Sequence, residues 1–208
     1  TLATAGVRAA PATIEVQVFD DEPGLGLLSD IDDTLTDTGV THKLRMIKNT
    51  LLRSAWEVRT FPDAPAVVTA LAGAGAARRP TFYLSGSPWG LHGRLAAFFA
   101  RSGFPRAPLL LRRYSQDPLD AYRYKLPRLR ALFAAFPRKR WVLLGDSGEK
   151  DPEVYATLRQ EHDGAVAATY IHLVTPEAPE SPRFAGALAF RDYAAVLRDA
   201  IARGLTIS

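Results

Sequence analysis

Residues 25–34 read LGLLSDIDDT, a short apolar run followed at once by three carboxylates around a single isoleucine. A run of about five apolar residues is typical of a strand that is buried on both faces of a parallel sheet. The residues after such a strand lie at the carboxyl edge of the sheet, where open α/β sheets bind their ligands. This stretch therefore predicts an α/β fold with an acidic ligand site at the end of its first core strand.

The rest of the chain alternates short apolar runs with longer helical patterns, which indicates a mainly parallel sheet built from βαβ units. We predict strands at residues 13–19, 25–29, 80–84, 109–112, 140–144 and 166–174. We predict helices at residues 44–56, 63–71, 88–101, 126–136, 151–161 and 192–203, and a proline-rich loop at residues 175–183. The expected architecture is a Rossmann-like three-layer sandwich with helices on both faces of a central sheet.

The 208 residues suit one domain, and a composition of 47% hydrophobic and 23% charged residues is that of a globular protein. We assign residues 25–208 to this domain and residues 1–24 to an N-terminal extension, either an edge strand or the end of an upstream domain. No apolar run reaches the roughly 20 residues that span a bilayer. The lack of cysteine excludes thiol catalysis and zinc–thiolate sites. The net charge of +4 fits an anionic partner, and we expect a cytoplasmic protein that can lie at the periphery of an anionic membrane.

Polar side chains also follow the other central strands that we predict. Because the carboxyl ends of parallel strands share one edge of a sheet, these side chains should converge. Lys125 reaches the same edge by opening the helix predicted after the strand at residues 109–112. The groups expected to meet are Asp30, Asp32, Ser85, Lys125, Asp146 and Asp151.

This set of groups suits phosphoryl transfer. A carboxylate that attacks a phosphate dianion meets like-charge repulsion of about 4 kcal/mol per charge pair at about 4 Å and an intermediate dielectric. A metal ion offsets that repulsion, and carboxylates without His or Cys favour a hard, oxygen-preferring cation such as Mg²⁺. We expect Asp30 and Asp146 to be its side-chain ligands.

Each remaining group has an expected role. Asp30 is our candidate nucleophile, because an aspartyl-phosphate divides one difficult step into two easier ones. Asp32, two residues later, is our candidate general acid and base. We expect Ser85 and Lys125 to hold phosphate oxygens, with Lys125 also countering the charge of Asp30. Asp151 should orient Lys125 or a metal-bound water.

The segments that carry these groups resemble the four motifs of the haloacid dehalogenase (HAD) superfamily, with DxDxT at residues 30–34 as motif one. The strings SDIDDT, YLSGSPW and GDSGEKDPEVY further resemble the catalytic domain of the actin-patch-type phosphatidate phosphatases, over residues 25–174. This resemblance implies a HAD-like fold and magnesium-dependent conversion of phosphatidate to diacylglycerol and phosphate. On this basis we also place Thr34 and Gly86 among the phosphate-binding residues and the backbone carbonyl of Asp32 among the metal ligands. His172 departs from the family pattern, which leads us to expect an arginine in residues 170–174.

The spacing of the motifs leaves room for a minimal cap or none. Residues 34–63 can hold a flap and one helix, and residues 85–125 can hold a helix, a strand and a connection. An open site favours a phosphate carried by something large, such as a lipid at an interface. Four aromatic residues could flank its mouth or be ordinary core or rim aromatics: Trp89, Tyr114, Tyr122 and Tyr124.

Several alternatives stay open. The motif-three cation is Lys125, Arg123 or Lys150, and Asp151 before Pro152 also fits a helix N-cap. Asp33 should brace the turn or the outer shell of the metal. The chain could instead be a phosphatase for a nucleic-acid end or a phosphoprotein, or a non-catalytic metal-binding interaction module. We do not otherwise expect a nucleic-acid partner.

Overall fold

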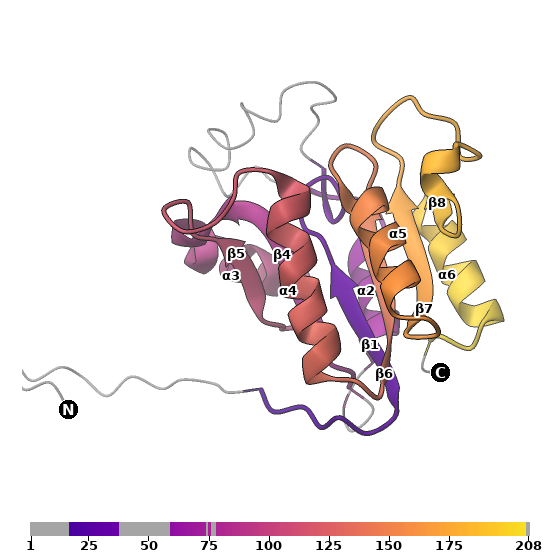
Figure 1. The fold of residues 1–208 in the computed structure, drawn as a ribbon, viewed down its shortest axis with the longest axis horizontal. Coiled ribbons are helices and arrows are strands. Elements are labelled where there is room, and N and C mark those ends of the chain that lie inside the picture. The colour runs from indigo at the N-terminus through magenta and orange to yellow at the C-terminus, as the bar shows by residue number, and fades with distance from the viewer. Residues whose placement is uncertain (1–16, 38–58, 74, 76–77, 207–208) are drawn as a thin grey trace, which may run out of the picture.

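A six-stranded, entirely parallel sheet forms the centre of the protein (Figure 1). The computed structural model describes residues 17–37, 59–73, 75 and 78–206. The strand order is β5-β4-β1-β6-β7-β8. The strands are β1 (Gly24–Ser29), β4 (Thr81–Pro88), β5 (Leu109–Arg112), β6 (Lys139–Asp146), β7 (Val166–His172) and β8 (Leu188–Phe190).

Helices cover both faces of this sheet. They are α2 (Ala64–Ala72), α3 (His92–Arg101), α4 (Ala121–Ala135), α5 (Asp151–Glu161) and α6 (Tyr193–Ala202), with short 3₁₀ turns η2 (Trp89–Leu91) and η3 (Pro182–Phe184). One hydrophobic core contains residues of α2, α3 and α6, and the other contains residues of α4 and α5. The α/β fold and its three layers are as predicted.

Strand β1 shows why the sheet forms at this position. Its side chains alternate, so that Leu27 belongs to one core and Leu28 to the other, and both are fully buried. The two neighbours of β1 are β4 and β6. At Gly26 the indole ring of Trp141 on β6 occupies the space that a Cβ atom would need, which explains a glycine inside the central strand.

Helix α4 begins five residues earlier than predicted, at Ala121 instead of residue 126. Asp120 caps it by accepting a hydrogen bond from the backbone N–H of Arg123 at 2.8 Å. Pro127, which would suit a helix start, lies inside the helix. Lys125 therefore lies within α4 and does not open it.

The boundaries of β4 and of the helix after it also differ from the prediction. β4 continues to Pro88, and α3 begins only at His92, after the turn η2. The pairing of β4 with β5 is irregular between Ser85 and Pro88, so the strand bends as it reaches the carboxyl edge.

Two small strand pairings were not predicted. β8 adds a three-residue parallel edge strand to β7, and β2 (Thr36–Asp37) pairs antiparallel with β3 (Arg59–Thr60). Residues 17–19 are not in a strand, and the rest of the strand predicted at 13–19 lies outside the described residues, as does the helix predicted at 44–56. Between β4 and α4 the chain forms only η2, α3, β5 and turns, which leaves no inserted cap domain there.

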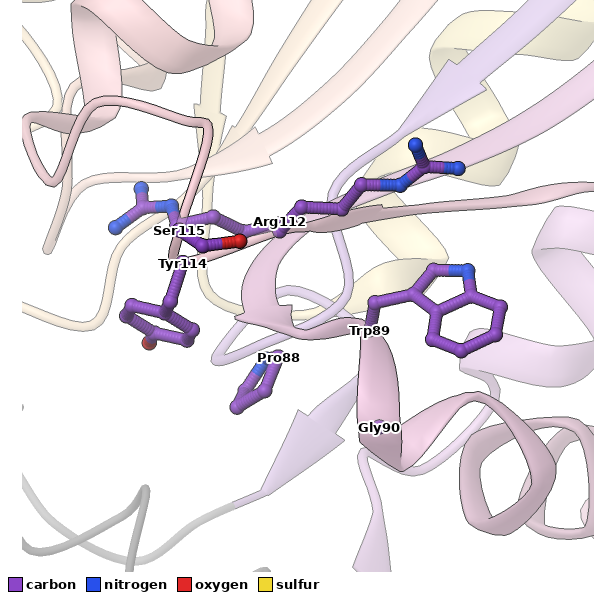
Figure 2. Close-up of a pocket in the computed structure, with 7 residues that line it drawn as sticks. Pro88, Trp89, Gly90, Arg112, Tyr114 and Ser115 are labelled. Atoms are coloured by element: carbon purple, nitrogen blue, oxygen red, sulfur yellow. The ribbon is translucent and has the colours of Figure 1, made fainter.

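A pocket of about 410 Å³ opens beside the ends of β4 and β5 (Figure 2). Its walls are Pro88, Trp89, Gly90, Arg112, Arg113, Tyr114 and Ser115. Among the described residues there is no helix that combines the length and the apolar character needed to cross a bilayer.

Candidate active site

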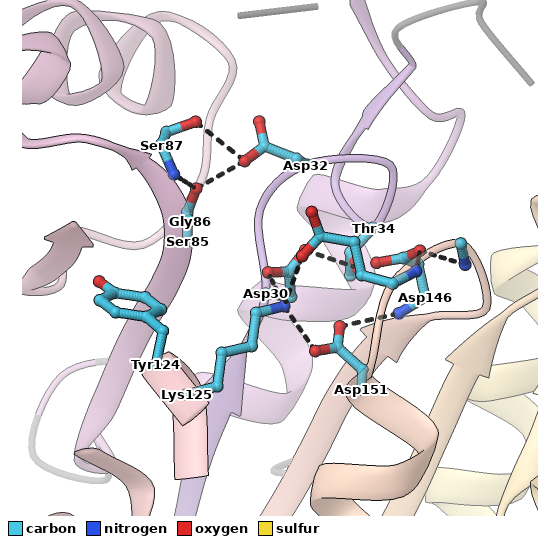
Figure 3. A network of polar contacts seen from close by, with 12 residues as sticks. Asp30, Asp32, Thr34, Ser85, Gly86, Ser87, Tyr124, Lys125, Asp146 and Asp151 are labelled. Atoms are coloured by element: carbon cyan, nitrogen blue, oxygen red, sulfur yellow. Dashed lines mark hydrogen bonds and ion pairs between the residues drawn. The ribbon is translucent and has the colours of Figure 1, made fainter. Parts of the chain in front are cut away.

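Asp30 lies at the carboxyl end of β1, buried at the centre of the sheet edge (Figure 3). Its backbone N–H donates to the carbonyl of Leu144 at 2.8 Å, which continues the pairing of β1 with β6 past the last strand residue. Lys125 Nζ donates to Asp30 Oδ1 at 2.7 Å, and Thr34 Oγ1 donates to Oδ2 at 3.2 Å. The Asp30 carboxylate is thus held from both sides.

Lys125 joins two carboxylates. Its Nζ also donates to Asp151 Oδ1 at 2.5 Å, and Glu149 Oε2 lies 3.6 Å away. Burial pushes the pKa of Lys125 down, but Asp151 and Asp30 outweigh that effect and hold the pKa well above its ordinary value. Lys125 therefore stays an ammonium ion although only 1% of it is exposed.

Asp146 lies at the end of β6 and has one unsatisfied oxygen. Its Oδ1 accepts the backbone N–H groups of Gly148 at 2.5 Å and Glu149 at 3.2 Å. Its Oδ2 is buried and has no hydrogen-bond partner within the described part of the chain. An unpaired buried carboxylate oxygen is costly, so it is a natural ligand for a cation.

Asp146 also belongs to a cluster of three buried carboxylates. Asp30, Asp146 and Asp151 can each offer one oxygen, and these atoms lie within 4.8 Å of one another. Burial, with repulsion from Asp151, raises the pKa of Asp146 well above its ordinary value. Burial likewise raises the pKa of Asp30 well above its ordinary value, although Lys125 opposes the shift. This all-oxygen cluster could hold a divalent metal ion, whose charge would oppose both shifts.

Asp32 belongs to a second group of contacts, with the end of β4 (Figure 3). Its Oδ2 accepts Ser85 Oγ at 2.5 Å and Ser87 Oγ at 3.0 Å. Burial raises the pKa of Asp32, while the hydrogen bond from Ser85 lowers it. The structure therefore brings the predicted residues Asp32 and Ser85 into direct contact, and adds Ser87, which sequence reasoning missed. Ser87 is the second serine of the string YLSGSPW, which was the sequence signal that could have found it.

Thr34 and Gly86 lie at opposite sides of the site. Thr34 is completely buried, and its hydroxyl reaches Asp30. A Cβ atom at Gly86 would lie 3.1 Å from Nη2 of Arg112, so this glycine lets the end of β4 pass close to a buried guanidinium. Sequence reasoning missed Arg112, which lies outside the motif strings, and Glu149, which lies inside the string GDSGEKDPEVY but was given no role.

Of the three candidate cations, Lys125 is the one that reaches the carboxylates. In the described residues, neither Arg123 nor Lys150 forms an ion pair with Asp30, Asp146 or Asp151. The N-cap expected at Asp151 is wrong. Lys150 occupies the cap position of α5, while Asp151 Oδ2 accepts the backbone N–H of Asp146 at 3.2 Å and leaves the helix N–H groups alone.

Comparison with known proteins identifies the family. The family model described as "Phosphatidate phosphatase APP1, catalytic domain" matches residues 25–173, most of the chain. This chain belongs to the APP1 catalytic domain family. The match begins with β1 and extends through both aspartate motifs and β7, so the whole carboxylate cluster of this APP1-type domain lies inside it.

Two relatives of this APP1-type domain are known from yeasts. Phosphatidate phosphatase APP1 of Saccharomyces cerevisiae is 29% identical over 167 residues, which cover 76% of this chain and 27% of that protein. Uncharacterized protein C29B5.04c of Schizosaccharomyces pombe is 31% identical over 153 residues, which cover 69% of this chain and 24% of that protein. The chain thus spans about a quarter of the length of these relatives. No solved structure matches it.

The family match also includes His172, the residue that departs from the expected pattern. His172 is buried, and its Nδ1 donates to the carbonyl of Asp33 at 2.9 Å. Asp33 has a left-handed backbone, with a φ of 56°, which turns the chain sharply after Asp32. His172 therefore contacts the turn that carries the two motif-one aspartates.

Proposed function

We propose that this domain is a magnesium-dependent phosphatidate phosphatase, which converts phosphatidate to diacylglycerol and phosphate through an aspartyl-phosphate. One observation carries the proposal: Asp30 is held by the buried ammonium of Lys125 beside an Asp146 oxygen that has no partner in the described part of the chain. Membership of the APP1 catalytic domain family supports the phosphatase chemistry, and the printed name of the S. cerevisiae relative supports the lipid substrate.

The donor set suits Mg²⁺. Asp30, Asp146 and the backbone carbonyl of Asp32 would hold the ion, which when bound supplies positive charge against the repulsion between carboxylate and phosphate. Both oxygens of Asp151 are already engaged, one by Lys125 and one by the Asp146 N–H. We therefore assign Asp151 the role of orienting Lys125.

In the first step, an Asp30 carboxylate oxygen attacks phosphorus, and the bond from phosphorus to the glycerol oxygen breaks. Asp32 donates its proton to that leaving oxygen. The raised pKa of Asp32 supports this assignment, because it favours the protonated carboxyl that the step requires. Thr34, buried behind Asp30, orients the attacking carboxylate.

In the second step, water attacks the phosphorus of the aspartyl-phosphate, Asp32 takes a proton from that water, and phosphate leaves with Asp30 restored. Lys125, Ser85 and the backbone at Gly86 lie along the site and would bind phosphoryl oxygens. Ser85 exchanges its hydrogen bond to Asp32 for one to the phosphoryl group.

The test is phosphate release, with and without Mg²⁺, from phosphatidate in mixed micelles, from phosphorylated DNA ends and from a small aryl phosphate. Asp30→Asn should abolish release from every substrate. Asp163→Asn makes the same chemical change at an exposed position after α5 and should leave the rates unchanged. Activity that survives in Asp30→Asn would refute the nucleophile, and release confined to DNA ends or the aryl phosphate would refute the lipid substrate.

A further inference from the structure

Exposed apolar side chains gather beside the proposed active site. The described residues contain five large hydrophobic side chains that are strongly exposed: Val18, Trp89, Tyr114, Leu119 and Ile201. Trp89 and Tyr114 form walls of the 410 Å³ pocket (Figure 2), and the carbonyl of Leu119 accepts a hydrogen bond from Arg112, another wall residue, at 2.8 Å. Two of the five thus line one opening, and Leu119 contacts a third wall residue through its backbone.

This pocket begins at the residues that directly follow the proposed catalytic segment of β4. Pro88 and Trp89 directly follow Ser87, whose hydroxyl donates to Asp32. The end of β4 therefore separates the catalytic carboxylates from the pocket, and a group attached to the scissile phosphate needs to pass only this strand end to enter it.

Arg112 provides a charge at the same place. It is nine-tenths buried, its Cζ lies 4.7 Å from the ring centroid of Tyr124, and its Nε has no hydrogen-bond partner among the residues described. Asp117, which forms an ion pair with Arg128, interacts electrostatically with Arg112 without pairing with it. A buried guanidinium N–H without an acceptor is costly, and a bound acceptor or anionic group would offset that cost.

We propose that this pocket receives the lipid part of the substrate. The glycerol ester oxygens would lie toward Arg112, the first acyl carbons would lie between the rings of Trp89 and Tyr114, and Leu119 would enter the membrane interface. Aromatic residues with one apolar and one polar end are typical of that interface, and arginine beside them attracts anionic headgroups. The inference rests on the proposed phosphatidate phosphatase function, whose substrate-binding surface it specifies.

The first test compares two substrates in the same variants. Trp89→Ala and Tyr114→Ala should each lower kcat/KM for phosphatidate in mixed micelles by about tenfold. The loss should be much smaller for a water-soluble aryl phosphate, so that the ratio of the two kcat/KM values falls. Ile201→Ala is the control, because Ile201 is an equally exposed apolar side chain on α6, which follows β8 at the opposite edge of the sheet from β5. It should not change that ratio.

The outcomes separate the pocket from the function. If the wild-type protein cleaves the aryl phosphate but not phosphatidate, the lipid function fails. If it cleaves phosphatidate and the pocket variants keep the wild-type ratio, the pocket assignment fails while the function stands. A loss confined to phosphorylated DNA ends would assign the aromatic walls to base stacking and overturn the proposal.

A second measurement needs no turnover. Asp30→Asn protein should be mixed with phosphatidylcholine vesicles that contain phosphatidate, with brominated acyl chains as quenchers of tryptophan fluorescence. We expect quenching that depends on phosphatidate and that is largely lost when Trp89→Phe is added. Trp56, the third tryptophan, is replaced by Phe in every protein compared, and Trp141 is buried in the core and should contribute little. Quenching that is unchanged by Trp89→Phe would contradict contact between Trp89 and the acyl chains.

Discussion

Lys125 neutralises two carboxylates that would otherwise face each other out of water. Lys125→Met should leave Asp30 and Asp151 as unpaired buried charges and lower the free energy of unfolding by about 3–5 kcal/mol at neutral pH. Urea denaturation measures this change, and kcat should fall by at least about a hundredfold if the ammonium also holds the phosphate.

Lys150→Met is the matched control, because Lys150 is exposed and close to the same loop. It should keep both stability and rate. Equal losses in the two variants would mean that the motif-three cation has been misassigned.

Because Asp146 Oδ2 is buried without a partner in the described residues, we expect the stability of the protein to depend on a bound metal ion. Adding Mg²⁺ to about 100 times its Kd should stabilise the wild-type protein by about 2.7 kcal/mol, visible as a rise in Tm. Asp146→Asn replaces one of the two expected carboxylate ligands and should remove most of this rise. Ca²⁺ titrated in parallel tests the preference for the smaller ion, and a full Tm response in Asp146→Asn would place the metal elsewhere.

At the scale of elements, Arg183 fastens the proline-rich segment to the loop that carries Asp146. Its Nη1 donates to the carbonyl of Ser147 at 2.6 Å, and its Nε donates to Glu153 Oε1 on α5 at 2.8 Å. Partial burial, the largest single effect, raises the pKa of Glu153. The hydrogen bond from Arg183, a backbone hydrogen bond and the positive charges of Arg183 and Lys150 together outweigh it, and the net shift is downward.

This shift gives a pH dependence of stability. A carboxyl whose pKa is lowered on folding stabilises the protein above its ordinary pKa of 4.5, and the contribution is lost as the pH falls through the lower folded value. Glu153→Gln should therefore reduce the free energy of unfolding at neutral pH by about 0.5 kcal/mol, allowing for the partial exposure of the pair. The difference from the wild type should shrink below pH 4.5. Glu180→Gln, an exposed change in the proline-rich segment that contains Arg183, should show no such trend.

Elements were predictable where their signals were local and strong. The apolar runs at β1, β5 and β6 stood out, whereas β8 has only three residues, and its pairing with β7 depends on a chain return that no local pattern encodes. The start of α4 was misplaced because Pro127 is a stronger local signal than the cap at Asp120. Lys125 nevertheless lies beside Asp30, because the helix runs along the sheet to the expected edge.

At the scale of the whole molecule, the convergence of polar groups followed from one rule, since parallel strands place their carboxyl ends together. The contact between Asp32 and Ser85 could not be predicted in this way. It depends on the bend of β4 after Ser85 and on side-chain rotamers, which respond to packing around Arg112 and Gly86.

Close packing at the centre of the sheet makes one substitution harmful to the entire fold. Gly26→Ala places a methyl group against the Trp141 indole, between the two largest strands of the core, and should lower the free energy of unfolding by about 2 kcal/mol. Gly93→Ala is the same change on α3, where a Cβ atom meets nothing within 4 Å, and should be neutral or slightly stabilising. Urea denaturation measures both variants. If Gly26→Ala proved as stable as Gly93→Ala, the close contact between Gly26 and the Trp141 ring would be contradicted.

The central place of β1 also has a consequence for synthesis on the ribosome. β1 emerges before the other core strands, yet both of its partners, β4 and β6, come later, with β6 ending only at Asp146. Leu27 and Leu28 therefore lack their partner strands while more than half of the chain is translated. Chaperones protect exposed apolar strands at this stage. The carboxylates Asp30, Asp146 and Asp151 consequently come together in one late event, so that the proposed active site cannot form in a nascent chain until its sheet is nearly complete.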